Sequence, residues 1–112
     1  MKPLFDIKEV NINCKCNQES TIDVEFIVHC GGPARICFDI PAAIPVFFKS
    51  TGSNSICHTI PNPKVEEKQK ISIPLIFETS KEDYYTYILT GSLTDFDGNT
   101  RSDYIGINLN CS

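Results

Sequence analysis

The sequence predicts an all-β protein, a two-sheet antiparallel β-sandwich of immunoglobulin-like topology with about seven strands. Three observations lead to this prediction. Apolar and polar residues alternate with a period of two along most of the 112 residues, and helical periodicity is almost absent. Turn-forming residues separate the alternating runs at short intervals. The length suits one domain and no linker or repeat is visible, so residues 1–112 are expected to form a single β-sandwich domain.

Four alternating runs occupy the first half of the chain. They cover residues 4–14, 22–30, 35–40 and 44–48. The first run changes phase after Ile7, which predicts a β-bulge near Lys8 and Glu9. The polar stretch 17–21 and the glycine-rich stretch 31–33 separate the runs and are predicted turns.

Residues 38–50, FDIPAAIPVFFKS, form the most apolar stretch of the chain. It is too short to span a bilayer, which takes about 20 apolar residues. Pro41 and Pro45 remove backbone donors, so the stretch is predicted to be a core strand that ends at a sheet edge. Neighbouring strand residues point to opposite faces, so either Phe47 or Phe48 should face away from the core. An exposed Phe beside an apolar edge indicates a pocket mouth or a partner surface.

Three further runs complete the predicted sandwich. They cover residues 71–77, 85–93 and 105–111. Pro74 lies inside the first of these runs and indicates an edge strand, because proline cannot donate a hydrogen bond to a neighbouring strand. Residues 95–99, DFDGN, are predicted to form the hairpin turn between the last two strands, with Gly98 able to adopt positive φ.

Composition and motifs narrow the classes of function. The formal net charge is −4 and the basic residues are scattered, which is not typical of a nucleic-acid-binding protein. His29 and His58 belong to no nucleophile motif, so we expect neither an enzyme nor a cofactor. Asp95 and Asp97 lie in the predicted hairpin turn and lack the rest of a calcium-loop pattern, so hydrogen bonds to the turn explain them best.

Six cysteines in a chain of 112 residues predict disulfides and an extracellular or other oxidising compartment. The cysteines expected to form disulfides are Cys14, Cys16, Cys30, Cys37, Cys57 and Cys111. Their spacing lacks the repeated C-x2-C pairs of a structural zinc site, so no metal is expected. The pairing stays open. Cys14 or Cys16 with Cys111 is favoured, because first and last strands that run parallel end at the same pole. Cys30 with Cys37, across the glycine-rich turn, is a weaker alternative.

Several stretches resemble the ML lipid-recognition domain, the family of the lysosomal cholesterol-transfer protein and the group-two mite allergens. The matching features are IKEVNI followed by Cys14, the apolar stretch IPAAIPVFF, Cys57 followed by Pro63 and Val65, and the hairpin of residues 87–99. The resemblance implies an immunoglobulin-like sandwich that holds a lipid or sterol between its sheets. The cysteine pattern departs from the family's, because residues 5–6 and 101–103 contain none.

Two functions from different classes are expected. The first is a secreted carrier that binds an apolar ligand, a lipid or sterol, between its sheets and gains about 25 cal/mol per Å2 of apolar surface buried. The residues expected to line its cavity are Ile36, Phe38, Ile40, Val46, Phe48, Leu75, Phe77, Tyr87 and Leu89. The alternative is a structural or adhesive extracellular module, which assembles into a homo-oligomer through an apolar edge strand and intermolecular disulfides. The expected partners are therefore an apolar small molecule or protein subunits, without nucleic acid or a membrane span.

Overall fold

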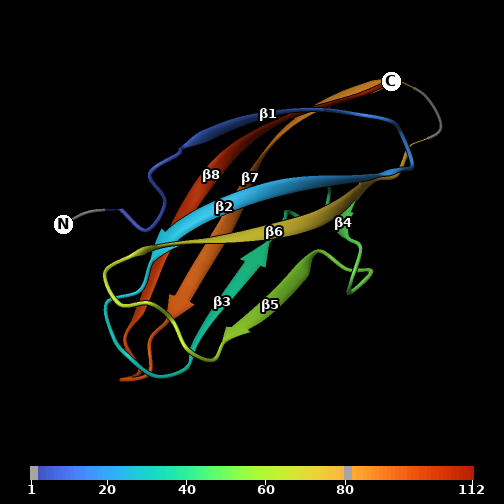
Figure 1. Cartoon of the computed structure of the whole chain (residues 1–112). Helices are drawn as coiled ribbons and strands as arrows, with labels where there is room; N and C mark the ends of the chain where they lie inside the picture. Colours follow the sequence, from blue (N-terminus) through green and yellow to red (C-terminus); the bar gives the residue numbers. More distant parts are fainter. Residues whose placement is uncertain (1–2, 80–81) are drawn as a thin grey trace.

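The computed structural model describes residues 3–79 and 82–112, and across these residues it consists of strands and turns with no helix (Figure 1). The eight strands are β1 (Glu9–Cys14), β2 (Glu19–Ile27), β3 (Ala34–Asp39), β4 (Val46–Phe48), β5 (Ser55–Ile60), β6 (Lys68–Phe77), β7 (Asp83–Thr94) and β8 (Thr100–Cys111). They form a five-stranded sheet in the order β1-β8-β7-β3-β5 and a three-stranded sheet in the order β2-β6-β4. The predicted all-β, two-sheet sandwich is confirmed.

The strand pairing is antiparallel except at one place. β1 runs parallel to β8, in a register that sets Cys14 opposite Cys111. β7 and β8 form a long hairpin in which Asp83 pairs with Cys111 and Thr94 with Thr100. The first and last strands therefore run side by side and reach the same pole of the sandwich.

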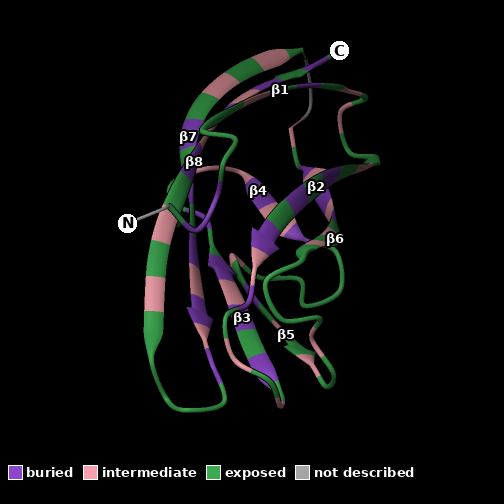
Figure 2. Ribbon diagram, turned by 60° about the vertical axis from the view of Figure 1, so that its left-hand side comes forward, coloured by how far each residue is buried: buried purple, intermediate pink, exposed green. Residues whose placement is uncertain are grey.

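The core lies between the two sheets and follows the predicted alternation. Buried and exposed positions alternate along the strands, as the colours of β2 and β3 show in Figure 2. Four residues predicted to face inward from different strands, Phe26, Phe38, Leu75 and Leu89, are all buried. Because these strands belong to both sheets, the period-two pattern identifies both faces that meet in the core.

The N-terminal segment differs from the prediction. No β-bulge forms near Lys8 and Glu9, because residues 3–8 lie outside any strand and β1 begins only at Glu9. The phase changes because the chain enters the sheet at this point. Before it does so, Phe5 inserts its side chain into the core and is only 1% exposed.

Pro74 lies in β6, the middle strand of the three-stranded sheet, so the prediction of an edge strand is wrong. Its neighbour β4 has only three residues, and the pairing of these two strands ends with Phe48 opposite Leu75. The Pro74 carbonyl accepts a hydrogen bond from the backbone N–H of Lys49, at 3.1 Å. A proline fits there because the pairing with β4 ends at Leu75, so no residue of β4 needs the backbone N–H that Pro74 lacks.

Residues 38–50 carry the chain from one sheet to the other. β3 ends at Asp39 in the five-stranded sheet, and β4 forms an edge of the three-stranded sheet. Pro41 and Pro45 lie in the connection between them, where no ladder needs their donors. Phe48 is buried and Phe47 is half-buried, as alternation requires. The chain then returns to the five-stranded sheet as β5, the strand that the sequence prediction missed.

Candidate functional site

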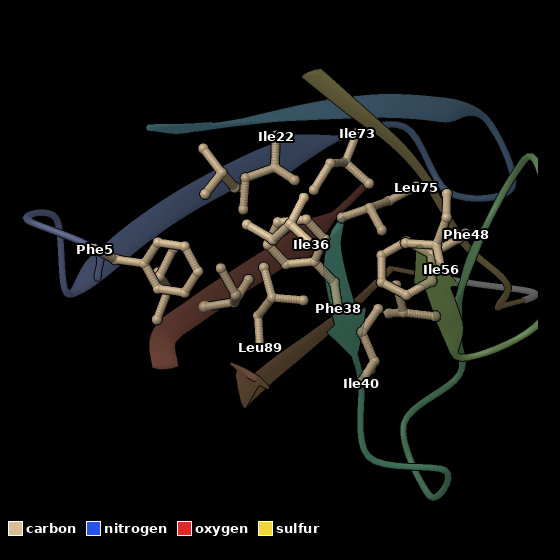
Figure 3. Close-up of a cluster of buried hydrophobic side chains, with 14 of the residues drawn as sticks. Phe5, Ile22, Ile36, Phe38, Ile40, Phe48, Ile56, Ile73, Leu75 and Leu89 are labelled. Carbon is tan, nitrogen blue, oxygen red and sulfur yellow. The ribbon is translucent and has the colours of Figure 1, made fainter. Parts of the chain in front are cut away.

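The nine residues predicted to line a ligand cavity all lie in the hydrophobic core and are 0–5% exposed. Figure 3 shows Phe38, Leu75 and Leu89 among the side chains that occupy the space between the sheets. Of the nine, only Val46 lines any of three hollows at the surface of the described residues. The structure thus brings the nine together as packed core, and their role in ligand binding stays a prediction.

A broad hollow of about 470 Å3 lies beside residues 38–50 and is open to solvent. Ile44, Val46 and Phe47 contribute its apolar part, and Asn54 and Glu78 contribute polar groups at its margin. The apolar stretch therefore borders a surface hollow, and its role as a pocket mouth or partner surface stays a prediction.

The outer face of the five-stranded sheet is distinctive in its chemistry. On β7 and β8 it consists of the residues that alternate with the buried ones: Tyr84, Thr86, Ile88, Thr90, Ser92, Thr94, Thr100, Ser102, Tyr104, Gly106, Asn108 and Asn110. We call this set the outer face. None of its members is charged, although charged residues make up 21% of the chain. Three of its large members are at least half exposed: Tyr84 at 59%, Ile88 at 50% and Tyr104 at 56%.

Side-chain contacts hold part of the outer face in place. Thr86 Oγ1 lies 3.1 Å from both the Tyr84 hydroxyl and Asn108 Oδ1. The Asn108 amide donates to Asn11 Oδ1 on β1, at 2.9 Å. The ammonium group of Lys8 lies 5.5 Å from the centre of the Tyr104 ring, within cation–π range. The exposed tyrosines are thus partly fixed before any partner arrives.

The solvent-exposed side of the three-stranded sheet, in contrast, carries charged side chains in ion pairs. Lys70 and Asp23 form an ion pair at 3.9 Å, and Lys68 and Glu25 form another at 3.5 Å. Exposed ion pairs of this kind contribute little to stability but keep a surface hydrated. The outward residues of β7 and β8 are therefore uncharged, while Glu9 on β1 and Arg35 and Asp39 on β3 lie at the margins of the same side of the sheet.

Four of the six cysteines form two disulfides. Cys16 bonds to Cys111, which is one of the two favoured alternatives, and Cys37 bonds to Cys57. The predicted pair of Cys30 with Cys37 is wrong, because β5 lies beside β3 and sets Cys57 directly opposite Cys37. Cys14 and Cys30 are free thiols. Two disulfides are compatible with an oxidising compartment.

The two free thiols have raised pKa values for different reasons. Burial raises the pKa of Cys14. A hydrogen bond with Asp97 is the main reason that the pKa of Cys30 is raised, and burial and the charges of Asp97 and Asp95 add to it. Both sulfurs are therefore mainly protonated at neutral pH, which lowers their reactivity as nucleophiles.

The remaining polar candidates have structural explanations. Nδ1 of His29 lies 2.7 Å from Oε1 of Glu66 at an exposed position. In the hairpin turn the Gly98 N–H donates to the Asp95 carbonyl at 3.0 Å, and Gly98 has φ of 88°. The Asn99 N–H donates to Asp97 Oδ1 at 3.2 Å, so the predicted role in the turn is confirmed for Asp97. Asp95 contributes only its backbone groups, and its Oδ1 is buried with no hydrogen-bond partner among the described residues.

Within the described ranges, no group of three or more His, Cys, Asp or Glu side chains is placed to hold a metal ion. Among the same residues, no helix is long and apolar enough to cross a membrane.

Besides β5 and the Cys37–Cys57 disulfide, sequence reasoning missed the core position of Phe5 and the charge-free outer face. The charge-free outer face was visible in the sequence. Every other residue from Tyr84 to Thr94, and from Thr100 to Asn110, lies on the outer face, and none of them is charged. The sequence prediction considered only the buried positions of these strands and therefore did not identify this pattern.

Comparisons with known proteins identify the fold but no family. No protein-family model matches the sequence, and no curated protein matches it. Among solved structures, the chain is similar to the ASH / PapD-like domain of human CEP192 (PapD-like domain 7). The TM-score is 0.55 at 8% identity, over 100% of this chain and 89% of that one. The fold therefore belongs to the class of immunoglobulin-like β-sandwiches, and the resemblance to the ML lipid-recognition domain stays a prediction.

Proposed function

We propose that the protein is an extracellular assembly module that associates with a second copy of itself through the outer face. The observation that carries this proposal is the absence of charged residues among the outward-facing residues of the two longest strands, β7 and β8. Tyrosine is enriched at protein interfaces, where its ring gives a large contact area at little cost in conformational entropy. Charged residues are depleted at the centres of such interfaces.

The chemistry of the outer face favours a second copy as the partner. In a two-fold symmetric dimer each face meets its own equivalent, so a charge near the two-fold axis would approach a like charge. The outer face has none, and the nearest charged residues of the sheet, Glu9, Arg35 and Asp39, lie on the flanking strands. The centres of two such faces can therefore meet without electrostatic repulsion between them.

The size of the face is sufficient when the flanking strands take part. β7 and β8 are 12 residues long and are flanked by β1 and β3, which have six residues each. At about 3.3 Å per residue and about 4.8 Å between strands, β7 and β8 present about 400 Å2 and the four strands about 600 Å2. Two copies joined through all four strands would bury about 1,200 Å2, the lower end of the range for specific complexes, with Glu9, Arg35 and Asp39 at the rim.

The carrier function is ranked second for a physical reason. A lipid or sterol between the sheets needs space that the nine core side chains fill in this structure. Such a ligand would have to displace them, and each displaced aromatic or aliphatic side chain costs about 1.5–3 kcal/mol of lost burial.

Sedimentation velocity over a wide range of protein concentration tests the assembly proposal. The native chain should form a dimer as concentration rises. Ile88→Lys should remove it, because two ammonium groups would meet at a desolvated centre. Thr21→Lys adds the same charge at an exposed position of β2, on the other sheet, and should leave the dimer intact. A native protein that stays monomeric throughout, or an Ile88→Lys variant that still dimerises, would refute the proposal.

A further inference from the structure

Phe5 occupies a slot that is shaped for an aromatic ring. Its ring stacks on Phe38 with the ring centres 6.2 Å apart, and Figure 3 shows it pointing from the N-terminal segment into the core. The floor of the slot is Gly91, where a Cβ atom would lie 2.3 Å from Cζ of Phe5. Only glycine leaves room for the ring at this position, so the slot depends on the pairing of Phe5 with Gly91.

The segment that carries Phe5 makes two of its polar contacts with one carboxylate, while its Lys8 carbonyl also accepts a bond from the Gly106 N–H and its Leu4 is buried. The Phe5 N–H donates to Oδ2 of Asp103 at 2.9 Å, and the ammonium group of Lys8 bonds to the same oxygen. The segment belongs to no strand, and Ile7, between these two anchors, is 55% exposed. The ring is thus deeply buried, but the backbone that inserts it lacks the continuous ladder of a strand.

Two hollows flank the same segment. One of about 230 Å3 is lined by Leu4, Asp6, Phe26 and Arg101 among others. Another of about 90 Å3 is lined by Phe5 itself, and Asp6 and Lys68 line both hollows. If Phe5 and Asp6 withdrew, the two hollows would join with the vacated slot into one cavity between the sheets.

The segment also places a carboxylate among basic groups. Oδ2 of Asp6 and Oε2 of Glu25 both lie 3.5 Å from Nζ of Lys68, at an exposed position next to the hollow that His29 and Arg101 line. Arg101 donates to the Ile27 carbonyl, while its Nε is buried and has no hydrogen-bond partner among the described residues. An unpaired guanidinium N–H is a strong donor for an anionic oxygen. Phe5 and Asp6 together thus present a ring followed by a carboxylate.

We propose that this site is a latent binding site for a small apolar carboxylic acid, which the chain's own Phe5 and Asp6 occupy in the ligand-free protein. The ligand's ring or alkyl group takes the slot over Gly91, and its carboxylate replaces that of Asp6 near Lys68 and Arg101. The native affinity is low, because binding first requires the segment to leave and the apparent affinity falls with the fraction of open molecules. The slot lies inside the sandwich and the outer face on its surface, Lys8 contacts both Asp103 and Tyr104, and the inference goes beyond the proposed assembly function.

Calorimetric titration with 3-phenylpropionate tests this site, with the neutral alcohol 3-phenylpropanol as the matched ligand. The double variant Phe5→Ala/Asp6→Ala should bind the acid at least about tenfold more tightly than the native chain does. In that double variant, Lys68→Gln should weaken binding of the acid by about tenfold, the loss of one charge-assisted contact, and leave binding of the alcohol unchanged. Thr59→Ala, an exposed change on β5 that borders neither hollow, should alter neither.

A second variant tests the site without enlarging the core. Asp103→Asn removes the charge that holds the segment and should raise the affinity for the acid, because more molecules are open. Near-ultraviolet circular dichroism should first establish that each variant is folded. Folded Asp103→Asn and double variants that do not bind the acid would overturn the proposal. Equal affinity for the acid and the alcohol would overturn its ligand class. Dimers formed by exchange of the N-terminal segment, in place of probe binding, would also overturn it.

Discussion

Replacing Gly91 with alanine is a direct test of how Phe5 packs in the core. The new methyl group would lie 2.3 Å from Cζ and 2.6 Å from Cε2 of Phe5, and 3.4 Å from Cε1 of Phe38. Carbon atoms in contact are normally about 3.5–4.0 Å apart, so the Phe5 ring must move by more than about 1 Å. Overpacking of this kind typically costs about 1–3 kcal/mol. For a domain of this size each kcal/mol lowers the melting temperature by about 4 °C.

The same substitution should behave differently once the ring is absent. Phe5→Ala alone should cost about 3–5 kcal/mol, from lost burial and the cavity left behind. In that variant Gly91→Ala should be neutral or stabilise by about 0.4–1 kcal/mol, because the methyl group enters vacated space and alanine restricts the unfolded chain. Urea denaturation of the four proteins of this cycle should therefore give a coupling energy on the order of 2 kcal/mol. If Gly91→Ala costs the same with and without the ring, then Phe5 does not rest on Gly91.

Three further predictions concern Asp103, the cysteines and the core. Burial alone would raise the pKa of Asp103, but its bonds with Lys8 and two backbone N–H groups outweigh this and lower it from the usual 3.8. Its contribution to stability should be present above that pH and lost as pH falls below it, and Asp103→Asn should remove this part of the acid dependence in urea titrations. Thiol titration of the denatured, unreduced protein should return two free thiols, those of Cys14 and Cys30, and six would contradict both disulfides. Phe26→Ala should cost about 3–5 kcal/mol, and an unchanged melting temperature would show that its inward orientation is wrong.

The fold could be predicted from the sequence because its information is local. Alternation in a strand such as β2 assigns Val24 and Phe26 to the core and Asp23 and Glu25 to the solvent, without knowledge of any neighbour. Edges are a different matter. Whether Pro74 is tolerated in β6 depends on where the neighbouring strand β4 ends. The sequence does not predict that end, because β4 has only three residues.

The candidate sites depend on contacts between residues that are distant in the sequence. The partner of Cys37 follows from the position of β5 beside β3, which no spacing rule provides. Phe5 looked like a strand residue out of phase. Its true role requires the missing side chain at Gly91 and the carboxylate of Asp103, and neither is near it in the chain. The charge-free outer face could have been predicted, because its residues are the exposed positions of two strands whose alternation the sequence already shows.

The parallel pair of β1 and β8 gives the molecule an unusual response to mechanical load. The Cys16–Cys111 disulfide joins the ends of these strands across a sequence separation of 95 residues. A pulling force applied at the two ends of the chain would pass from β1 through the sulfur bridge to the last residue and would bypass the strands between them. At about 3.3 Å per extended residue, the oxidised bridge prevents about 30 nm of chain from extending under the force. The sandwich between Cys16 and Cys111 would therefore remain folded under tension.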